Sequence, residues 1–306
     1  MTRSRGGRGP ARLRKLRAAA AGLVGLASPS GVALSAAAPA HADTTWNYAQ
    51  LNIRGYAGGN NGDPTIATSV KSFVRARYNA GRAPMAVSLQ EVCHDPNGLS
   101  QLNSLASGAN NLPSMGYTTK FYRPTAINPT RSNCTHYGIA VSMLWDSQAM
   151  PVVRTSLLPR ANVGDERRGV ICATTRFGGK WHNGCSPHLH NDSSALTHQA
   201  GPVTDFIADF NRDYPHFGKY WGGDLNTDPI PLYTASGSTP WRAGYEEADP
   251  NVLHPSDALK TWSIGNPRRK LDYLFAARSL WDDSSIQRYS YALQDHFWMF
   301  GRFTRH

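Results

Sequence analysis

The chain has 306 residues, with 32 Lys and Arg against 21 Asp and Glu, and a formal net charge of +11 at pH 7. Seven of the basic residues lie in the first 17 positions, so 32 − 7 = 25 basic residues face 21 acidic ones in residues 43–306, a net charge of +4. The strong positive charge is therefore confined to the N-terminal segment. The mild charge of the remainder is compatible with a polyanionic partner but does not require one.

The N-terminal segment has the pattern of a secretory signal peptide. A basic head is followed by an apolar stretch over residues 18–38, then by Pro39 and by Ala40 and Ala42, two small residues spaced two apart. This pattern predicts export and cleavage after Ala42. The sequence Ser-Pro-Ser-Gly at 28–31 interrupts the apolar stretch, which is too broken for a membrane span of ~20 residues. We therefore expect a secreted domain over residues 43–306 without stable membrane association.

The first half of this domain predicts short strands and two helices. Residues 46–53 alternate as in a strand and lead into a loop rich in Gly and Asn at 54–64. Residues 65–80 have helical spacing, with Ile66, Val70 and Val74 on one face. A short apolar strand is expected at 85–91 and a helix at 99–112.

The second half continues the same alternation. The expected strands are 138–145, 170–177, 180–188, the segment from Tyr220 to Asp224, 271–276 and 296–303, and the clearest amphipathic helix is 195–213. This order excludes an all-helical protein and a simple repeat of strand–helix–strand units. Residues 43–306 contain no low-complexity linker and no internal repeat, so we expect one large domain.

Four cysteines lie in the exported part, and export permits disulfides. They are Cys93, Cys134, Cys172 and Cys185. Three pairings are possible, and a hairpin with Gly178-Gly179 as its two-residue turn favours one of them. Its register places Phe177 opposite Lys180 and Cys172 opposite Cys185, at a non-hydrogen-bonded pair where side chains lie close. The bridge between Cys93 and Cys134 follows by elimination, and no CxxC spacing indicates a zinc site.

Polar side chains recur where the predicted strands begin or end, which are positions that hold functional groups rigidly. They are Asn52, Gln90, Glu91, His188, Asp224, Asn226, Asp272, Asp295 and His296. Their order resembles the endonuclease/exonuclease/phosphatase superfamily, which includes deoxyribonuclease I. That superfamily has an Asn after the first strand, then Gln-Glu, a strand-end His, Gly-Asp-x-Asn, Asp-Tyr and a final Asp-His. Each motif alone is weak, but six in this order are specific.

The resemblance implies a four-layer α/β sandwich, in which two mixed sheets pack face to face between helices. It also implies a divalent cation, Mg²⁺ or else Mn²⁺ or Ca²⁺, on Glu91 with Asn52 beside it and Asp295 assisting. Gln294 departs from the Ser that the superfamily usually has before Asp-His, which affects the hydrogen bonding expected around Asp295.

The remaining motif residues imply acid–base chemistry on a phosphoester. His296 is the expected general base, oriented by Asp272, because imidazole titrates near neutrality. Asp224 and Asn226 are expected to orient water or phosphate, with a metal-binding contribution. His188 is expected to bind phosphate or to act as the leaving-group acid, and His190 is its nearby competitor.

Substrate contacts are expected from basic and aromatic residues. Arg167 and Arg168 precede a strand near the place where nucleases of this superfamily bind the substrate phosphate through an Arg, although a solvated pair is an equal alternative. Tyr137 is a candidate for stacking on substrate. The aromatic residues at 297–300 alternate and indicate core.

Export, mild positive charge and the strand-end His favour a monomeric secreted nuclease acting on DNA, similar to deoxyribonuclease I or to the catalytic subunit of cytolethal distending toxin. A phospholipase of the sphingomyelinase type is the first alternative, but it needs a long apolar hairpin, and the hairpin at Gly178 is short and polar. A phosphoinositide phosphatase is another alternative. A non-catalytic binding protein is disfavoured by the complete set of motif residues.

Overall fold

The computed structural model describes residues 44–54, 62–95, 98, 100–124, 134–146, 152–160, 166–191, 193–234, 244–251, 258–262, 269–290 and 295–305. The expected signal peptide and Gln294 lie outside these residues. The described part belongs to one compact unit, His41–His306.

The first of two six-stranded sheets has the strand order β11-β12-β1-β2-β4-β3. Its strands are β1 (Thr44–Asn52), β2 (Pro84–His94), β3 (Tyr117–Tyr122), β4 (His136–Leu144), β11 (Asp283–Tyr289) and β12 (Trp298–Arg305). Only β1 and β2 pair in parallel, and the other neighbours are antiparallel.

The second sheet has the strand order β5-β6-β7-β8-β10-β9. Its strands are β5 (Val153–Leu157), β6 (Gly169–Phe177), β7 (Lys180–His188), β8 (Gly218–Asp224), β9 (Tyr245–Glu247) and β10 (Asp272–Ala277). Here β7 and β8 form the parallel pair. The two central parallel pairs place the carboxyl ends of β1, β2, β7 and β8 together, and those ends carry the motif residues.

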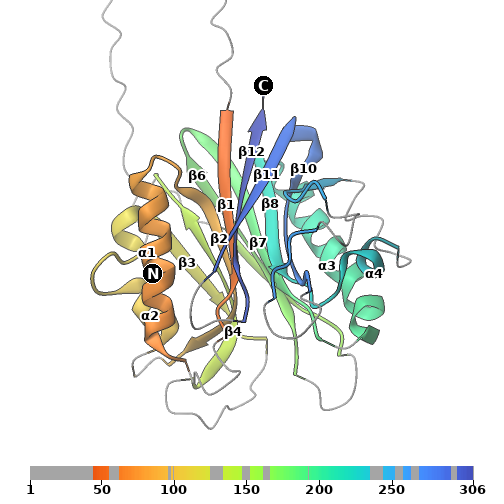
Figure 1. Ribbon diagram of the computed structural model, residues 1–306, viewed down its shortest axis with the longest axis horizontal. Helices are drawn as coiled ribbons and strands as arrows, with labels where there is room; N and C mark the ends of the chain where they lie inside the picture. Colours follow the sequence, from red (N-terminus) through yellow and green to blue (C-terminus); the bar gives the residue numbers. More distant parts are fainter. Residues whose placement is uncertain are drawn as a thin grey trace, which may run out of the picture. The chain divides into compact units, whose positions relative to one another are not determined.

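The helices lie on the outer sides of the two sheets (Figure 1). They are α1 (Pro64–Asn79) and α2 (Gln101–Ala106) beside the first sheet, and α3 (Ser193–Asp213) and α4 (Pro229–Thr234) beside the second, with short 3₁₀ turns at Pro113–Met115 and Arg278–Leu280. Helix α1 begins where the Asp63 carboxylate accepts a hydrogen bond from the Thr65 backbone N–H at 2.8 Å, with Pro64 in the first turn. This arrangement confirms the expected four-layer sandwich.

Aromatic rings fill the space between the sheets and beneath α3. Tyr48 of β1 stacks on Tyr220 of β8 with ring centroids 3.7 Å apart, and both are buried. Trp221, on the other face of β8, stacks on Phe275 and packs with the apolar face of α3. Each such ring removes a large apolar area from water, so the Tyr48–Tyr220 contact helps hold the two sheets together and the Trp221 cluster helps hold α3 on the second sheet.

The predicted hairpin is confirmed with its register. Phe177 lies opposite Lys180 and Cys172 opposite Cys185, and both turn glycines have positive φ, as a two-residue turn of this kind requires. Disulfides join Cys172 to Cys185 and Cys93 to Cys134, with Cα atoms 4.1 and 4.9 Å apart, so both pairings are confirmed.

The helix expected at 99–112 is wrong over its second half. Helix α2 ends at Ala106, and Gly108 adopts a φ of +72°, which a continuing right-handed helix does not contain. Four described strands were not predicted from the sequence: β3, β5, β9 and β11. All four lie at sheet edges, and their half-exposed residues lack the continuous apolar run of β2 or β8.

Candidate active site

Residues from both sheets meet at the carboxyl ends of the parallel strands. Asn52 ends β1, His188 ends β7 and Asp224 ends β8, while Asp272 opens the antiparallel strand β10. The backbone register places Asp224 beside His188 on one side and Asp272 on the other. The sheet pairing therefore determines the spacing of these side chains.

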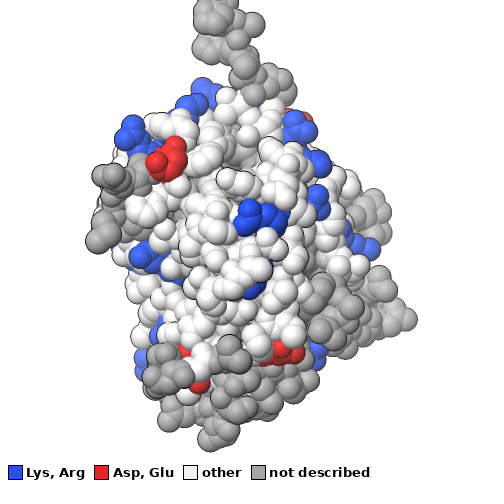
Figure 2. Space-filling view, turned by 90° about the vertical axis from the view of Figure 1, so that its left-hand side faces the viewer, with Lys and Arg blue, Asp and Glu red and all other residues white. Residues whose placement is uncertain are grey.

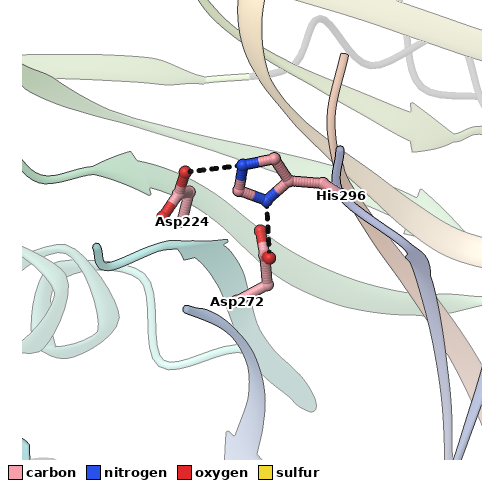
Figure 3. A group of neighbouring side chains, drawn as sticks. All are labelled: Asp224, Asp272 and His296. Carbon is pink, nitrogen blue, oxygen red and sulfur yellow. Dashed lines mark hydrogen bonds and ion pairs between the residues drawn. The ribbon is translucent and has the colours of Figure 1, made fainter. Parts of the chain in front are cut away.

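An imidazole lies between two carboxylates in this cluster (Figure 3). The Nδ1 atom of His296 is 2.7 Å from Oδ2 of Asp272, and its Nε2 atom is 3.7 Å from Oδ2 of Asp224. All three side chains are buried. Nδ1–H of His296 donates to Asp272, which leaves Nε2 directed toward Asp224.

The carboxylates control the charge of this imidazole. Burial lowers the pKa of His296, but the negative charges of Asp272 and Asp224 outweigh burial and raise the pKa to about 10. Burial, together with the negative charge of Asp272, raises the pKa of Asp224 to about 7. The expectation that His296 titrates near neutrality, as an ordinary imidazole does, is therefore wrong for this arrangement of charges.

Glu91 carries a buried carboxylate oxygen that is open to a cation. Its Oε1 atom accepts a hydrogen bond from Nδ2 of Asn52 at 3.0 Å, and the same amide nitrogen donates to Oδ2 of Asp224 at 2.9 Å. Its Oε2 atom is buried and has no hydrogen-bond partner among the described residues. A buried anionic oxygen without a donor is costly, and a hard divalent cation would satisfy it.

The backbone at Glu91 is strained in a way that presents this carboxylate. Glu91 has a φ of +56°, and the pairing between β2 and β4 shifts register there, between Leu89 and Val92. A left-handed conformation of a residue other than glycine costs ~1–3 kcal/mol and is enriched at functional sites. The bulge re-aims the Glu91 side chain within β2, which continues to His94 rather than ending at Glu91 as expected.

A second ligand set is geometrically possible. Asp224, Asp272 and His296 each have one ligand atom within 4.8 Å of the others. However, Oδ2 of Asp272 already accepts from His296, and Oδ1 accepts from Nε2 of Gln50 at 2.7 Å. Because the carboxylate of Asp272 is occupied by donors, the residues around Glu91 fit a cation better.

A basic group lies on the other side of Asp224. Nη1 of Arg168 lies 2.7 and 2.9 Å from the two ring nitrogens of His188, and Nη2 lies 3.3 Å from Glu166. Burial, together with the positive charges of Arg168 and His296, lowers the pKa of His188 well below its usual value. His188 is therefore held neutral, which favours phosphate binding over a leaving-group acid.

Asn226 completes this side of the cluster. Its backbone N–H donates to Oδ1 of Asp224 at 2.9 Å, and its side-chain amide donates to the carbonyl of Leu189 at 2.9 Å. The amide nitrogen also lies 3.3 Å from Nε2 of His188. A φ of +51° lets Asn226 turn back toward these partners, which a small amide side chain tolerates.

The remaining predicted residues divide between the cluster and its surroundings. The hydroxyl of Tyr137 interacts with Arg168, and its burial together with the charge of Glu91 raises its pKa well above the usual value. Arg167 instead acts electrostatically on Tyr122. Asp295 forms an ion pair with Arg54 at 3.5 Å. The structure thus brings Arg168 and Tyr137 into the cluster and places Arg167 outside it.

Gln50 and Thr261 contact Asp272 and were not predicted from the sequence, and the same holds for Glu166 beside Arg168 and for Arg54 beside Asp295. Gln50 donates to Asp272, as described above, and Thr261 accepts hydrogen bonds at Oγ1 from the backbone N–H groups of Leu271 and Asp272 at 3.0 and 2.9 Å. Neither residue belongs to a motif that marks it in the sequence. Gln50 reaches Asp272 across a sequence separation of 222 residues, whereas Thr261 acts across separations of 10 and 11 residues.

No family model and no curated protein sequence matches the chain. Solved structures resemble it over most of its length. D. rerio TDP2 complexed with a single-strand DNA product has a TM-score of 0.56 and 14% identity, covering 85% of this chain and 99% of that one. The human Nocturnin catalytic domain with bound sulfate has a TM-score of 0.55 and 16% identity, covering 85% and 94%.

ANGEL2, described as a 2′,3′-cyclic phosphatase, has a TM-score of 0.58 and 12% identity, covering 86% of this chain and 95% of that one. At these identities the likeness establishes the fold. All three structures have the fold that the motif order predicts for this chain. The protein therefore has the α/β sandwich fold of the endonuclease/exonuclease/phosphatase superfamily.

Proposed function

We propose that the protein is a divalent-metal-dependent phosphodiester hydrolase whose substrate class is nucleic acid, with DNA as the expected substrate. One observation carries the proposal: the buried His296–Asp272 pair faces Asp224 beside a Glu91 oxygen that has no donor among the described residues. Phosphodiester hydrolysis needs a cation to stabilise charge on the phosphoryl group and a side chain to accept a proton from water, and this site has groups for both.

Glu91, with Asp295 assisting, would hold the cation. Asn52 was also expected as a ligand, but its amide nitrogen faces Glu91 and its Oδ1 atom accepts from the Arg54 backbone N–H at 2.9 Å, so Asn52 would instead position the Glu91 carboxylate. Mg²⁺ fits an all-oxygen donor set, and Mn²⁺ or Ca²⁺ would use the same ligands. When bound, the cation stabilises negative charge on the phosphoryl oxygen, and its positive charge lowers the pKa of His296 toward the range in which imidazole accepts a proton.

The chain's own groups have distinct proposed roles. His296 takes a proton from the attacking water, and Asp272 orients the ring and stabilises the imidazolium that forms. His188, Asn226 and Arg168 offer donors to phosphate oxygens, and a charged guanidinium is well suited to that contact. Asp224 holds its position between the two histidines and orients water.

The nucleic-acid class is supported by both the fold and the site. Among the similar structures, D. rerio TDP2 contains a single-strand DNA product and ANGEL2 is a cyclic phosphatase. Arg168 and Tyr137 lie beside the catalytic cluster as candidate phosphate and base contacts. On the face that carries α1 and α2, Lys and Arg form separate spots on mostly uncharged surface (Figure 2), so the site itself, rather than a basic stripe on that face, supports the proposal.

We also propose that the protein acts after export, with residues 1–42 removed. The two disulfides support an oxidising compartment. Among the described helices, none combines the length and apolarity that a membrane crossing requires.

The direct test offers the purified protein plasmid DNA, RNA, sphingomyelin and inositol phosphates, each with Mg²⁺ or with a chelator. We expect cleavage of DNA that chelation abolishes and Mg²⁺ or Mn²⁺ restores. Glu91→Gln should weaken that restoration because it removes the charge of the proposed ligand, whereas the exposed control Asp205→Asn should not. Full turnover after exhaustive chelation would contradict the proposed metal dependence. Faster cleavage of sphingomyelin than of DNA would contradict the proposed substrate class.

A further inference from the structure

Gln50 lies near the carboxyl end of β1, fully buried between the two sheets. Its amide nitrogen is 2.7 Å from Oδ1 of Asp272 and 2.7 Å from Oε1 of Gln90. The amide nitrogen carries two hydrogens and donates one to each oxygen. The flipped orientation would place the amide oxygen against a carboxylate and a carbonyl, so the neighbours determine which way the side chain points.

The contact completes the hydrogen bonding of the Asp272 carboxylate. Oδ1 accepts from Gln50 and Oδ2 lies 2.7 Å from Nδ1 of His296, while the Asp272 backbone N–H donates to Thr261. A carboxylate held at both oxygens cannot rotate away from its imidazole partner without losing a hydrogen bond. Because Asp272 is completely buried, bulk water is not at hand to replace the lost donor.

Gln50 is itself held by a relay that crosses the sheet interface. Gln90 of β2, which accepts from Gln50, donates through Nε2 to Oγ of Ser186 on β7 at 2.9 Å. The Ser186 hydroxyl donates back to the carbonyl of Leu89 at 3.2 Å. All of these side chains are buried, and the relay joins the first sheet to the second directly behind the catalytic cluster.

We infer that Gln50 is a positioning residue for the Asp272–His296 pair, because its amide fixes the carboxylate oxygen that His296 does not use. The inference rests on the proposed function for its effect on turnover, but not for its effect on the hydrogen bond. Gln50 touches no reacting group. It acts only through Asp272, so its removal should change how the pair works without changing how substrate is bound.

The test replaces Gln50 by Met in the full protein, which keeps the length of the side chain and removes the donor. Two quantities are measured: steady-state kcat and KM on DNA with Mg²⁺, and the downfield proton resonance of the hydrogen-bonded Nδ1–H of His296. Loss of that resonance in His296→Gln assigns it. The matched control is Asn183→Leu, which removes another buried amide, one that donates to Asn211 and to the Tyr214 carbonyl.

We expect Gln50→Met to lower kcat by ~10- to 100-fold, as loss of one hydrogen bond to a charged group does, while KM changes by less than about twofold. The Nδ1–H resonance should shift or broaden. Gln50→Asn keeps a polar side chain but is too short to span both oxygens, so it should give the same result if Gln50→Met does not fold. Asn183→Leu should change neither quantity.

A wild-type resonance and a wild-type kcat in folded Gln50→Met or Gln50→Asn would overturn the inference. An equal loss in Asn183→Leu would also overturn it, because the effect would then be general destabilisation. If the wild-type protein cleaves none of the phosphodiesters offered, the proposed function fails. The resonance then decides the role of Gln50 by itself.

Discussion

The surroundings of single buried histidines determine their pKa in this protein. Within the described part of the chain, three imidazoles are buried in very different surroundings: His296 between two carboxylates, His188 against a guanidinium, and His182 among aromatic rings. The two carboxylates raise the pKa of His296, whereas burial, more than any neighbouring charge, lowers the pKa of His188 and of His182. The type of residue alone could not have assigned these charges, since all three share the same reference pKa.

His182 leads to a prediction about acid stability. Burial lowers its pKa to about 4, and its ring packs 4.7 Å from that of Trp46. The folded state therefore binds this proton less readily than the unfolded chain. Keeping His182 neutral contributes to the free energy of unfolding in full above pH ~6.5. This contribution should be lost as the pH falls toward 4, by on the order of 2 kcal/mol between pH 7 and pH 5.

Urea unfolding at pH 7 and pH 5 measures this loss. His182→Phe should reduce the difference between the two pH values, since the ring that would be protonated is gone. The exposed His198 provides the control, and His198→Gln should leave the difference unchanged. An unaltered pH dependence in His182→Phe would show that another group causes the acid loss.

Whole strands and turns were predictable where the sequence contains a strong local signal. The Gly178-Gly179 turn and the two flanking strands determined the register of β6 and β7, and with it the Cys172–Cys185 bridge. The edge strands β5 and β11 were missed because one side of each is exposed and their apolar residues are few. The bulge at Glu91 was also not predictable, since no glycine marks its positive φ.

The hairpin bridge should contribute measurably to stability. Cys172 and Cys185 enclose a loop with a sequence separation of 13, and closing a loop of this size typically stabilises by ~2–4 kcal/mol. The paired change Cys172→Ala with Cys185→Ala should lower the free energy of unfolding in urea by that amount. Non-reducing peptide mapping checks the pairing, and a link between Cys93 and Cys172, or four free thiols, would refute it.

The proposed catalytic cluster forms only where distant parts of the chain meet in the fold. Motif order along the chain predicted Glu91, Asp224, Asp272 and His296 as site residues, although the structure places Glu91 within β2 rather than at its end. It could not identify Gln50, which is 222 residues from Asp272 in the sequence and reaches it only because the two sheets pack face to face. It also could not decide between Arg167 and Arg168, because both precede β6 and only the folded structure shows which of them reaches His188.

The most direct test of the proposed acid–base pair is a double-mutant cycle on His296 and Asp272. The kcat of each variant is measured on the best DNA substrate with Mg²⁺. His296→Ala should lower kcat by ~10²–10⁴-fold, the usual worth of general acid–base catalysis. Asp272→Asn should lower it through the same step, because the imidazole loses the charge that orients it. The double variant should lose little more than His296→Ala alone. Near-normal turnover in folded His296→Ala, or fully additive losses, would contradict the account.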